Sequence, residues 1–299
     1  MLTPEQQIQY QASLKHPDVE ETIDLWFYRP VGFRLALLGQ RLRWTPNQIT
    51  VLSIFLGIGC GLLLYPQSLW LNLIGILLLV MADVCDSADG QLARLTQQYS
   101  QLGRILDGAA GDFWFVAIYV CLALRLTPEW GVWCWVLAVL AGACHSQQAA
   151  MADYYRQFHL LCVKGRSGSE LDDASAVARQ YAETRFSDDP VQKVFLWFYR
   201  SYTRGQERLT PQMQRLRHLP FRPELISPLT RPLMPICNIL TFNWRAITLF
   251  LSVLVGLPCL YWVAELTVFN TLALGLVLRH EHICRRAIAS LSSPQAATS

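Results

Sequence analysis

Charge, and lysine in particular, is scarce in this 299-residue sequence. Charged residues make up 16% of the chain against 53% hydrophobic residues. Only Lys15, Lys164 and Lys193 are lysines among the 25 basic residues, so the positive charge is carried almost entirely by arginine. So apolar a composition excludes a disordered chain and most cytosolic folds.

The sequence also lacks paired-cysteine motifs and the features of a secretory signal. The nine cysteines include no CxxC pair, and several lie inside apolar stretches, which argues against a disulfide framework or a zinc site. The first 21 residues lack the basic lead and apolar segment of a secretory signal. We therefore expect no cleaved signal peptide.

Four stretches contain no charged residue, namely 49–82, 113–124, 130–152 and 246–264. A helix of about 20 apolar residues crosses the hydrocarbon core of a bilayer. The first stretch holds two such helices, because Tyr65-Pro66-Gln67-Ser68 breaks it into a hairpin. With further helices at 102–124, 130–152, 246–264 and 267–284, the sequence predicts an all-α, polytopic membrane protein with six transmembrane helices.

Arginines gather before the first predicted span, between the second and third, and near the C-terminus. The positive-inside rule then predicts that both termini are cytoplasmic, and in a bacterium the membrane would be the inner or plasma membrane. We divide the chain into four segments. They are an N-terminus (1–43) with an amphipathic juxtamembrane helix at 22–43, spans one to four (44–157), a cytoplasmic helical insert (158–237), and the last two spans with a tail (238–299).

Five aspartates interrupt this apolar pattern: Asp83, Asp86, Asp89, Asp107 and Asp112. The first three recur every third residue and form a stripe on one helix face, and the other two open the next span. Acidic groups at this depth are costly and face an interior or a wet cavity. Gathered together they would repel unless cations neutralised them, and oxygen ligands suit Mg²⁺ or Mn²⁺. A two-metal site here would suit a diphosphate, whereas helix capping and pairing with Arg94 and Arg104 is the purely structural alternative.

A family resemblance rests on these residues. The sequence reads Asp86-Ser-Ala-Asp89-Gly90-Gln-Leu-Ala93-Arg94, eight residues, then Gly103-Arg-Ile-Leu-Asp107. It resembles the signature of the CDP-alcohol phosphotransferases, also called CDP-alcohol phosphatidyltransferases, which is D-x2-D-G-x2-A-R-x8-G-x3-D-x3-D. Seven of the eight fixed positions match. The resemblance extends over roughly residues 22–157.

The resemblance implies an enzyme of phospholipid synthesis that transfers a substituted phosphate from a CDP-alcohol to a hydroxyl acceptor and releases CMP. By position, Asp86, Asp89 and Asp107 would hold metal, and the fourth aspartate of the family would add to metal binding and act as the general base. Gly90, Ala93, Arg94 and Gly103 would bind the CDP moiety. Arg104 and Asp83 are additional candidates for the site.

The last position of the signature is where this sequence departs. It falls on Gly111, and Asp112 follows one residue later. On a regular helix Asp112 lies about 140° from Asp107. We favour a one-residue π-bulge, which would return Asp112 to the site as metal ligand and general base, because such bulges gather at functional sites. The alternative is a vacant position, with Asp83 as the nearest substitute base.

The substrates stay open at this stage. We lean toward CDP-diacylglycerol as the donor, because arginine suits bidentate phosphate recognition. The alternatives are a CDP-choline or CDP-ethanolamine type of transfer to a lipid hydroxyl, and a catalytically silent relative that binds CDP-lipids. A transporter is disfavoured because the last two spans carry no interior acid. We expect membrane lipids but no nucleic acid as partners, and we leave a homodimer open.

Overall fold

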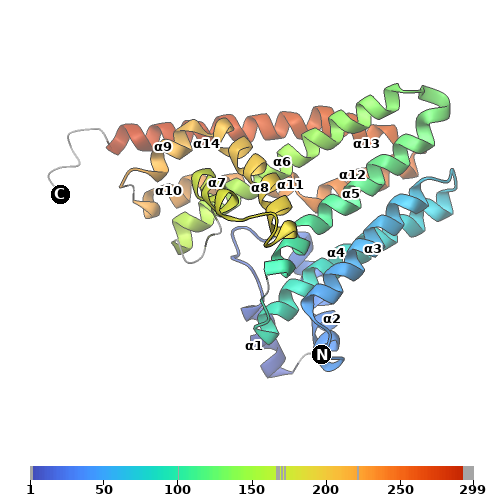
Figure 1. The fold of residues 1–299 in the computed structure, drawn as a ribbon, viewed down its shortest axis with the longest axis horizontal. Helices are drawn as coiled ribbons and strands as arrows, with labels where there is room; N and C mark the ends of the chain where they lie inside the picture. The colour runs from blue at the N-terminus through green and yellow to red at the C-terminus, as the bar shows by residue number, and fades with distance from the viewer. Residues whose placement is uncertain are drawn as a thin grey trace. The chain divides into compact units, whose positions relative to one another are not determined.

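The computed structural model describes residues 3–99, 101–165, 169, 171, 173–220 and 222–291, without the side chains of residues 101, 102, 104 and 105. All regular elements in this part of the chain are helices (Figure 1), which confirms the predicted all-α class. The chain divides by contacts into two compact units. Unit 1 comprises Met1–Ser146 and Phe242–Val268, and unit 2 comprises Gln147–Thr241 and Phe269–Ser299.

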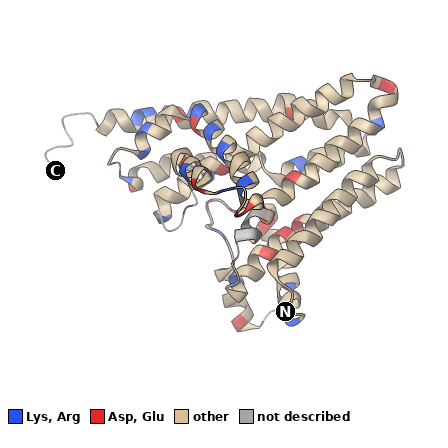
Figure 2. Ribbon diagram, viewed as in Figure 1, with Lys and Arg blue, Asp and Glu red and all other residues tan. Residues whose placement is uncertain are grey.

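Unit 1 holds the predicted site. In chain order its elements are α1 (Pro4–Ala12), η1 (Asp24–Tyr28), α2 (Arg29–Arg41), α3 (Pro46–Leu64), α4 (Leu69–Thr96), α5 (Gln101–Trp130), the first part of α6 (Trp133–Lys164), α12 (Phe242–Leu254), α13 (Cys259–Ala264) and most of η4 (Glu265–Phe269). The ribbon of α3 and α4 is tan over most of its length in Figure 2, as expected of helices with few charges.

Unit 2 is built from the rest of α6, the helices that follow it and the C-terminal helix. They are α7 (Ala174–Glu183), α8 (Pro190–Leu209), α9 (Pro211–Arg217), α10 (Pro223–Thr230), η3 (Arg231–Leu233), α11 (Met234–Ile239) and α14 (Asn270–Leu291). Glu281 of α14 accepts hydrogen bonds from the backbone amides of Gln212 and Met213, at 2.8 and 3.2 Å. This contact satisfies two otherwise open amides at the N-terminus of α9.

The hairpin of α3 and α4 forms as the sequence predicts. The two helices run side by side in Figure 1, and the chain reverses between Leu64 and Leu69, at the Pro66 break. Thr45 begins α3 with a capping box: its hydroxyl accepts from the amide of Gln48, whose side chain accepts from the amide of Thr45. Thr45 therefore has a structural role at this helix end.

Two glycines let α3 approach α5 closely. Gly57 lies against the indole of Trp114, and a Cβ on Gly61 would come within 2.7 Å of the carbonyl carbon of Ala117. Small residues one turn apart allow two helix backbones to approach in an apolar environment. The core around this contact includes Cys60, which is fully buried. The α3–α5 contact thus holds together two of the three helices that shape the predicted site.

Five candidate spans are found in the described residues, where six were predicted. They are Pro46–Leu64, Leu69–Thr96, Leu106–Trp130, Pro223–Leu254 and Cys259–Leu291. The predicted fourth span, 130–152, lies mostly within α6, which is not among them. Its polar residues from His145 to Gln148 lower its hydropathy. The predicted amphipathic helix over 22–43 is helical as η1 and α2, while its placement at a membrane surface stays a prediction.

The last predicted turn is wrong. The interval between the predicted spans 246–264 and 267–284 puts this turn at Glu265-Leu266, but the chain turns at Gly256, which has a φ of +77°, just before Pro258. Glu265 instead lies in the helical turn η4, where its side chain is fully buried and pairs with Arg245 of α12 at 2.5 Å. The prediction is wrong because Arg245 and Glu265 flank the uncharged stretch 246–264 and were therefore assigned to the two ends of one span. Each of these buried charges is tolerated because the opposite charge beside it neutralises it.

We expect Gly61→Ala to destabilise the chain by about 1–3 kcal/mol, because the added methyl group meets the backbone of α5 and forces the helices apart. Thermal unfolding of the purified protein in detergent measures the effect. Gly142→Ala is the matched control, since a Cβ there meets nothing within 4 Å. Equal melting temperatures for the two variants would contradict the close approach.

Removing one partner of the buried ion pair should cost more than removing both. We expect Arg245→Met to destabilise the chain by about 3–5 kcal/mol, since it leaves Glu265 buried without its cation. The double variant Arg245→Met/Glu265→Met should recover much of that loss. Unfolding of the wild type, of Arg245→Met, of Glu265→Met and of the double variant measures the coupling, and simple addition of the two single effects would argue against the pair.

Candidate active site

The aspartates of α4 lie on its last turns. The helix ends at Thr96, and Gln97 follows in the left-handed conformation with a φ of +55°. The side chain of Gln97 donates to the carbonyl of Arg94 at 2.8 Å, which satisfies one open carbonyl at this end. The chain can then turn and begin α5 at Gln101. This short connection brings the start of α5 back toward the acidic stripe.

Three of the predicted aspartates meet. Carboxylate oxygens of Asp86, Asp89 and Asp107 all lie within 4.8 Å of one another. Asp86 and Asp89 come from α4 and Asp107 from α5. Asp89 is buried, Asp86 is half-buried and Asp107 is exposed, so the group opens on the side of Asp107. The predicted convergence from two adjoining helices is present.

The donor set fits a hard divalent cation. Oxygen atoms of carboxylates are the ligands that Mg²⁺ and Mn²⁺ prefer, and the group contains no histidine or cysteine. Thr50 of α3 donates its hydroxyl to Asp89 at 2.5 Å, which fixes one carboxylate oxygen. Ordering of a ligand by such a neighbour is typical of metal sites. We did not predict Thr50 as part of the site, because a threonine one turn into an apolar helix gives no signal by itself.

The N-terminal segment also contributes, which the sequence did not reveal. Arg29 is buried, forms an ion pair with Glu20 at 3.2 Å and donates to the hydroxyl of Ser87 at 3.3 Å. The charges of Arg29 and Lys15 both act on Asp86. Residues 22–43 were interpreted only as a membrane-surface helix, so Arg29 was counted for topology and not for the site.

Tyr28 of the N-terminal segment lies near enough to the acidic stripe for the charge of Asp83 to act on it. Burial, together with the negative charges of Asp83, Asp24 and Glu21, raises the pKa of its hydroxyl. The phenol therefore stays protonated over the physiological range. Asn243 of α12 donates to both Glu21 and Asp24, at 2.9 and 2.8 Å. These contacts fix the N-terminal segment against α12 within unit 1.

Arg94 and Gly90 form a small open corner beside the three aspartates. A Cβ on Gly90 would lie 3.4 Å from a guanidinium nitrogen of Arg94, at ordinary contact distance. The Nε of Arg94 is buried and has no hydrogen-bond partner within the described part of the chain. An unpaired, buried guanidinium donor is costly unless a ligand satisfies it. Ala93 and Gly103 are both half-buried, and the side chain of Arg104 lies outside those described.

Asp112 does not join the group, and the predicted π-bulge is wrong. Residues Gln101–Trp130 form a continuous α-helix, so Asp112 points about 140° away from Asp107. Its side chain lies on an exposed surface of α5. The two glycines, Gly108 and Gly111, would permit a bulge but do not require one, since glycine also fits a regular helix turn. Asp83 is half-buried one turn before Asp86, and the charge of Asp86 acts on it.

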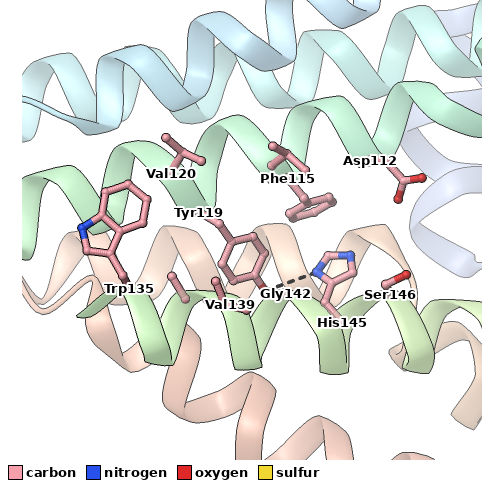
Figure 3. Close-up of a pocket in the computed structure, with 11 residues that line it drawn as sticks. Asp112, Phe115, Tyr119, Val120, Trp135, Val139, Gly142, His145 and Ser146 are labelled. Atoms are coloured by element: carbon pink, nitrogen blue, oxygen red, sulfur yellow. Dashed lines mark hydrogen bonds between the residues drawn. The ribbon is translucent and has the colours of Figure 1, made fainter. Parts of the chain in front are cut away.

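Asp112 lines a separate cavity of about 390 Å³ between α5 and α6 (Figure 3). Phe115, Tyr119 and Trp135 form its apolar part, and His145 lies beside Asp112 at the polar end. Nδ1 of His145 lies 3.4 Å from the hydroxyl of Tyr119 and 3.4 Å from Glu265. His145 thus belongs to the polar network around the Arg245–Glu265 pair.

The chain is similar to known proteins over this region. Residues 43–156 match the family model described as CDP-alcohol phosphatidyltransferase. A protein of Aquifex aeolicus named bifunctional IPC transferase and DIPP synthase is 33% identical over 138 residues, which are 46% of this chain and 28% of that protein. A putative cardiolipin synthase of Mycobacterium tuberculosis is 32% identical over 98 residues, 32% of this chain and 46% of that protein.

The matched segments thus span less than half the length of either relative. The family model, by contrast, covers the whole acidic motif, from before α3 into α6, including the three converging aspartates and Arg94. Residues 43–156 of this chain thus match a CDP-alcohol phosphatidyltransferase domain, in agreement with the resemblance of the acidic motif.

Proposed function

We propose that this protein transfers a substituted phosphate from a CDP-alcohol to a hydroxyl acceptor and releases CMP, with divalent cations at its site. The observation that carries the proposal is the convergence of Asp86, Asp89 and Asp107 within 4.8 Å, next to the open corner at Gly90 and Arg94. A group of carboxylates that suits a cation, beside an arginine whose buried Nε has no partner in the described chain, suits a diphosphate.

The donor would bind through its diphosphate and nucleotide. Arg94 would direct its paired N–H groups at phosphate oxygens, and its unpartnered Nε is available for such a bond. Gly90 would let the ligand approach the backbone of α4, because no side chain fills the space. Ala93 and Gly103 would border the same pocket. This binding fixes the diphosphate at the open side of the aspartate group.

Asp86, Asp89 and Asp107 would hold Mg²⁺ or Mn²⁺, in a two-cation arrangement. Bound there, the cations would neutralise the negative charge that develops on the leaving CMP. Thr50 would keep Asp89 oriented through its hydrogen bond.

The acceptor hydroxyl needs a base, and we assign that role to Asp83. Asp112 points away from the three aspartates, whereas Asp83 is on the same helix, one turn from Asp86. In the reaction, the acceptor oxygen forms a bond to phosphorus, the bond from phosphorus to the CMP oxygen breaks, and Asp83 takes the hydroxyl proton. A positioned base of this kind contributes roughly 100-fold or more in rate.

We further propose CDP-diacylglycerol as the donor and the cytoplasmic side of the membrane as the location of the site. The arginine-rich composition supports both, through phosphate recognition and the positive-inside rule. The curated relatives are named for different products, cardiolipin in one case and DIPP in the other. They support a shared reaction class and leave the acceptor to experiment.

We expect Asp86→Asn, Asp89→Asn and Asp107→Asn each to abolish CMP release, because each removes a charge that binds metal. Asp83→Asn should lower kcat roughly 100-fold or more with little effect on metal binding, whereas Asp112→Asn should stay near the wild type. The measurement is CMP release from a panel of CDP-alcohols with Mn²⁺ or Mg²⁺, with and without a chelator.

The same panel identifies the donor. Turnover only with CDP-choline or CDP-ethanolamine would overturn the choice of CDP-diacylglycerol. Binding of CDP-alcohols without turnover for any pair would show a silent relative and overturn the proposed reaction. Full loss of activity in Asp112→Asn, with Asp83→Asn active, would reverse the assignment of the base.

Gly90→Ala tests the donor pocket separately from the metal. The methyl group fits beside Arg94 without a clash, and alanine favours a helix by about 1 kcal/mol over glycine, so the variant should be at least as stable as the wild type. Its KM for the donor should rise at least tenfold, because the methyl group takes the space of the diphosphate. Gly275→Ala, with open space around it, is the control, and an unchanged KM would contradict the pocket.

A further inference from the structure

Helix α8, in unit 2, exposes two neighbouring bands that nothing in the proposed reaction uses. Its buried side carries Leu196, Thr203 and Gln206, and Gln206 donates to the carbonyl of Ala150 at 2.8 Å. This bond fixes α8 to the part of α6 that belongs to unit 2. The rest of α8 is therefore a surface of defined orientation.

The first band is basic. Arg200, Arg204 and Arg208 recur every fourth residue and border a cavity of about 400 Å³. The other residues that line this cavity are Gln147, Trp197, Ser201 and Gly205. Arg200 stacks on the ring of Tyr181, with its Cζ 4.3 Å from the centroid. Arg204 and Arg208 are exposed, and neither forms an ion pair with another described residue. A cavity bordered by three guanidinium groups suits a phosphate-bearing ligand.

No acid on α8 compensates this charge. Glu207 is the one acidic residue in the helix, and its carboxylate accepts a hydrogen bond from the amide of Ala174 at 2.9 Å. It is therefore directed at the N-terminus of α7, where it interacts favourably with the helix dipole. The basic band keeps its net positive charge.

The second band is apolar. Val191, Val194 and Phe198 are 57%, 47% and 61% exposed, and they lie within about 60° of one another around the helix axis. Trp197, 51% exposed, lies among the arginines of the first band and lines the same cavity. Exposed apolar residues beside a row of arginines that includes a tryptophan are the pattern of a helix that lies in a membrane interface.

We propose that α8 docks on an anionic lipid surface, with the headgroup phosphate of an acidic phospholipid in the arginine-lined cavity and the apolar band among the acyl chains. Charge complementarity favours this occupant. The basic band pairs with phosphate and the apolar band with hydrocarbon, and a lipid surface offers the two side by side. The candidate spans of the same chain keep it at a membrane throughout. The docking does not depend on the proposed phosphotransfer.

The test uses the full chain in nanodiscs of phosphatidylcholine, with or without phosphatidylglycerol. Hydrogen–deuterium exchange of residues 190–209 should be slower with phosphatidylglycerol present. Arg204→Gln/Arg208→Gln should remove the difference, because two arginines at an anionic surface contribute about 2 kcal/mol, or roughly thirtyfold in the docking equilibrium. Phe198→Glu should remove it too.

Arg215→Gln is the matched control, because Arg215 is exposed on α9 of the same unit and does not border the cavity. It should keep the slowing. Equal exchange in the two kinds of disc, or slowing that survives the double arginine variant or Phe198→Glu, would overturn the proposal. Slower exchange in phosphatidylcholine discs that hold two chains than in those that hold one would also overturn it, since the partner would then be a second copy.

Discussion

Repulsion among three carboxylates is the constraint on which the rest of unit 1 depends. Asp86, Asp89 and Asp107 lie within 4.8 Å of one another, inside helices that otherwise suit a lipid environment. Such a group is stable only if opposite charge and hydrogen-bond donors surround it. Thr50 supplies a donor to Asp89, and Arg29 and Lys15 act on Asp86. A bound divalent cation would supply the remaining positive charge.

Packing of the apolar helices holds this group in place. The glycines of α3 bring α5 close, and the left-handed Gln97 ends α4 so that α5 can return beside it. Because these contacts fix both helices that carry aspartates, the site does not depend on long flexible side chains. The buried pair of Arg245 and Glu265 shows the same logic elsewhere in unit 1, where a charge is tolerated because its partner is fixed beside it.

The helical class, the α3–α4 hairpin and the meeting of Asp86, Asp89 and Asp107 could be predicted, because hydropathy and three-residue spacing act locally. The contributions of Thr50 and Arg29 could not, since they depend on which helix faces which. The bulge at Asp112 was wrongly predicted from a cost argument, because an acid on a span can also face a cavity. The turn at Gly256 was missed because Glu265 was assigned to a loop before its partner Arg245 was known.

The central claim is that Asp86, Asp89 and Asp107 together bind a divalent cation. Titration of the purified full chain with Mn²⁺, followed by electron paramagnetic resonance, measures this binding without any substrate or turnover. The account predicts that the wild type and Asp112→Asn bind Mn²⁺ alike, and that binding is lost in Asp86→Asn, Asp89→Asn and Asp107→Asn. Undiminished Mn²⁺ binding by a variant in which all three aspartates are changed to asparagine would contradict it.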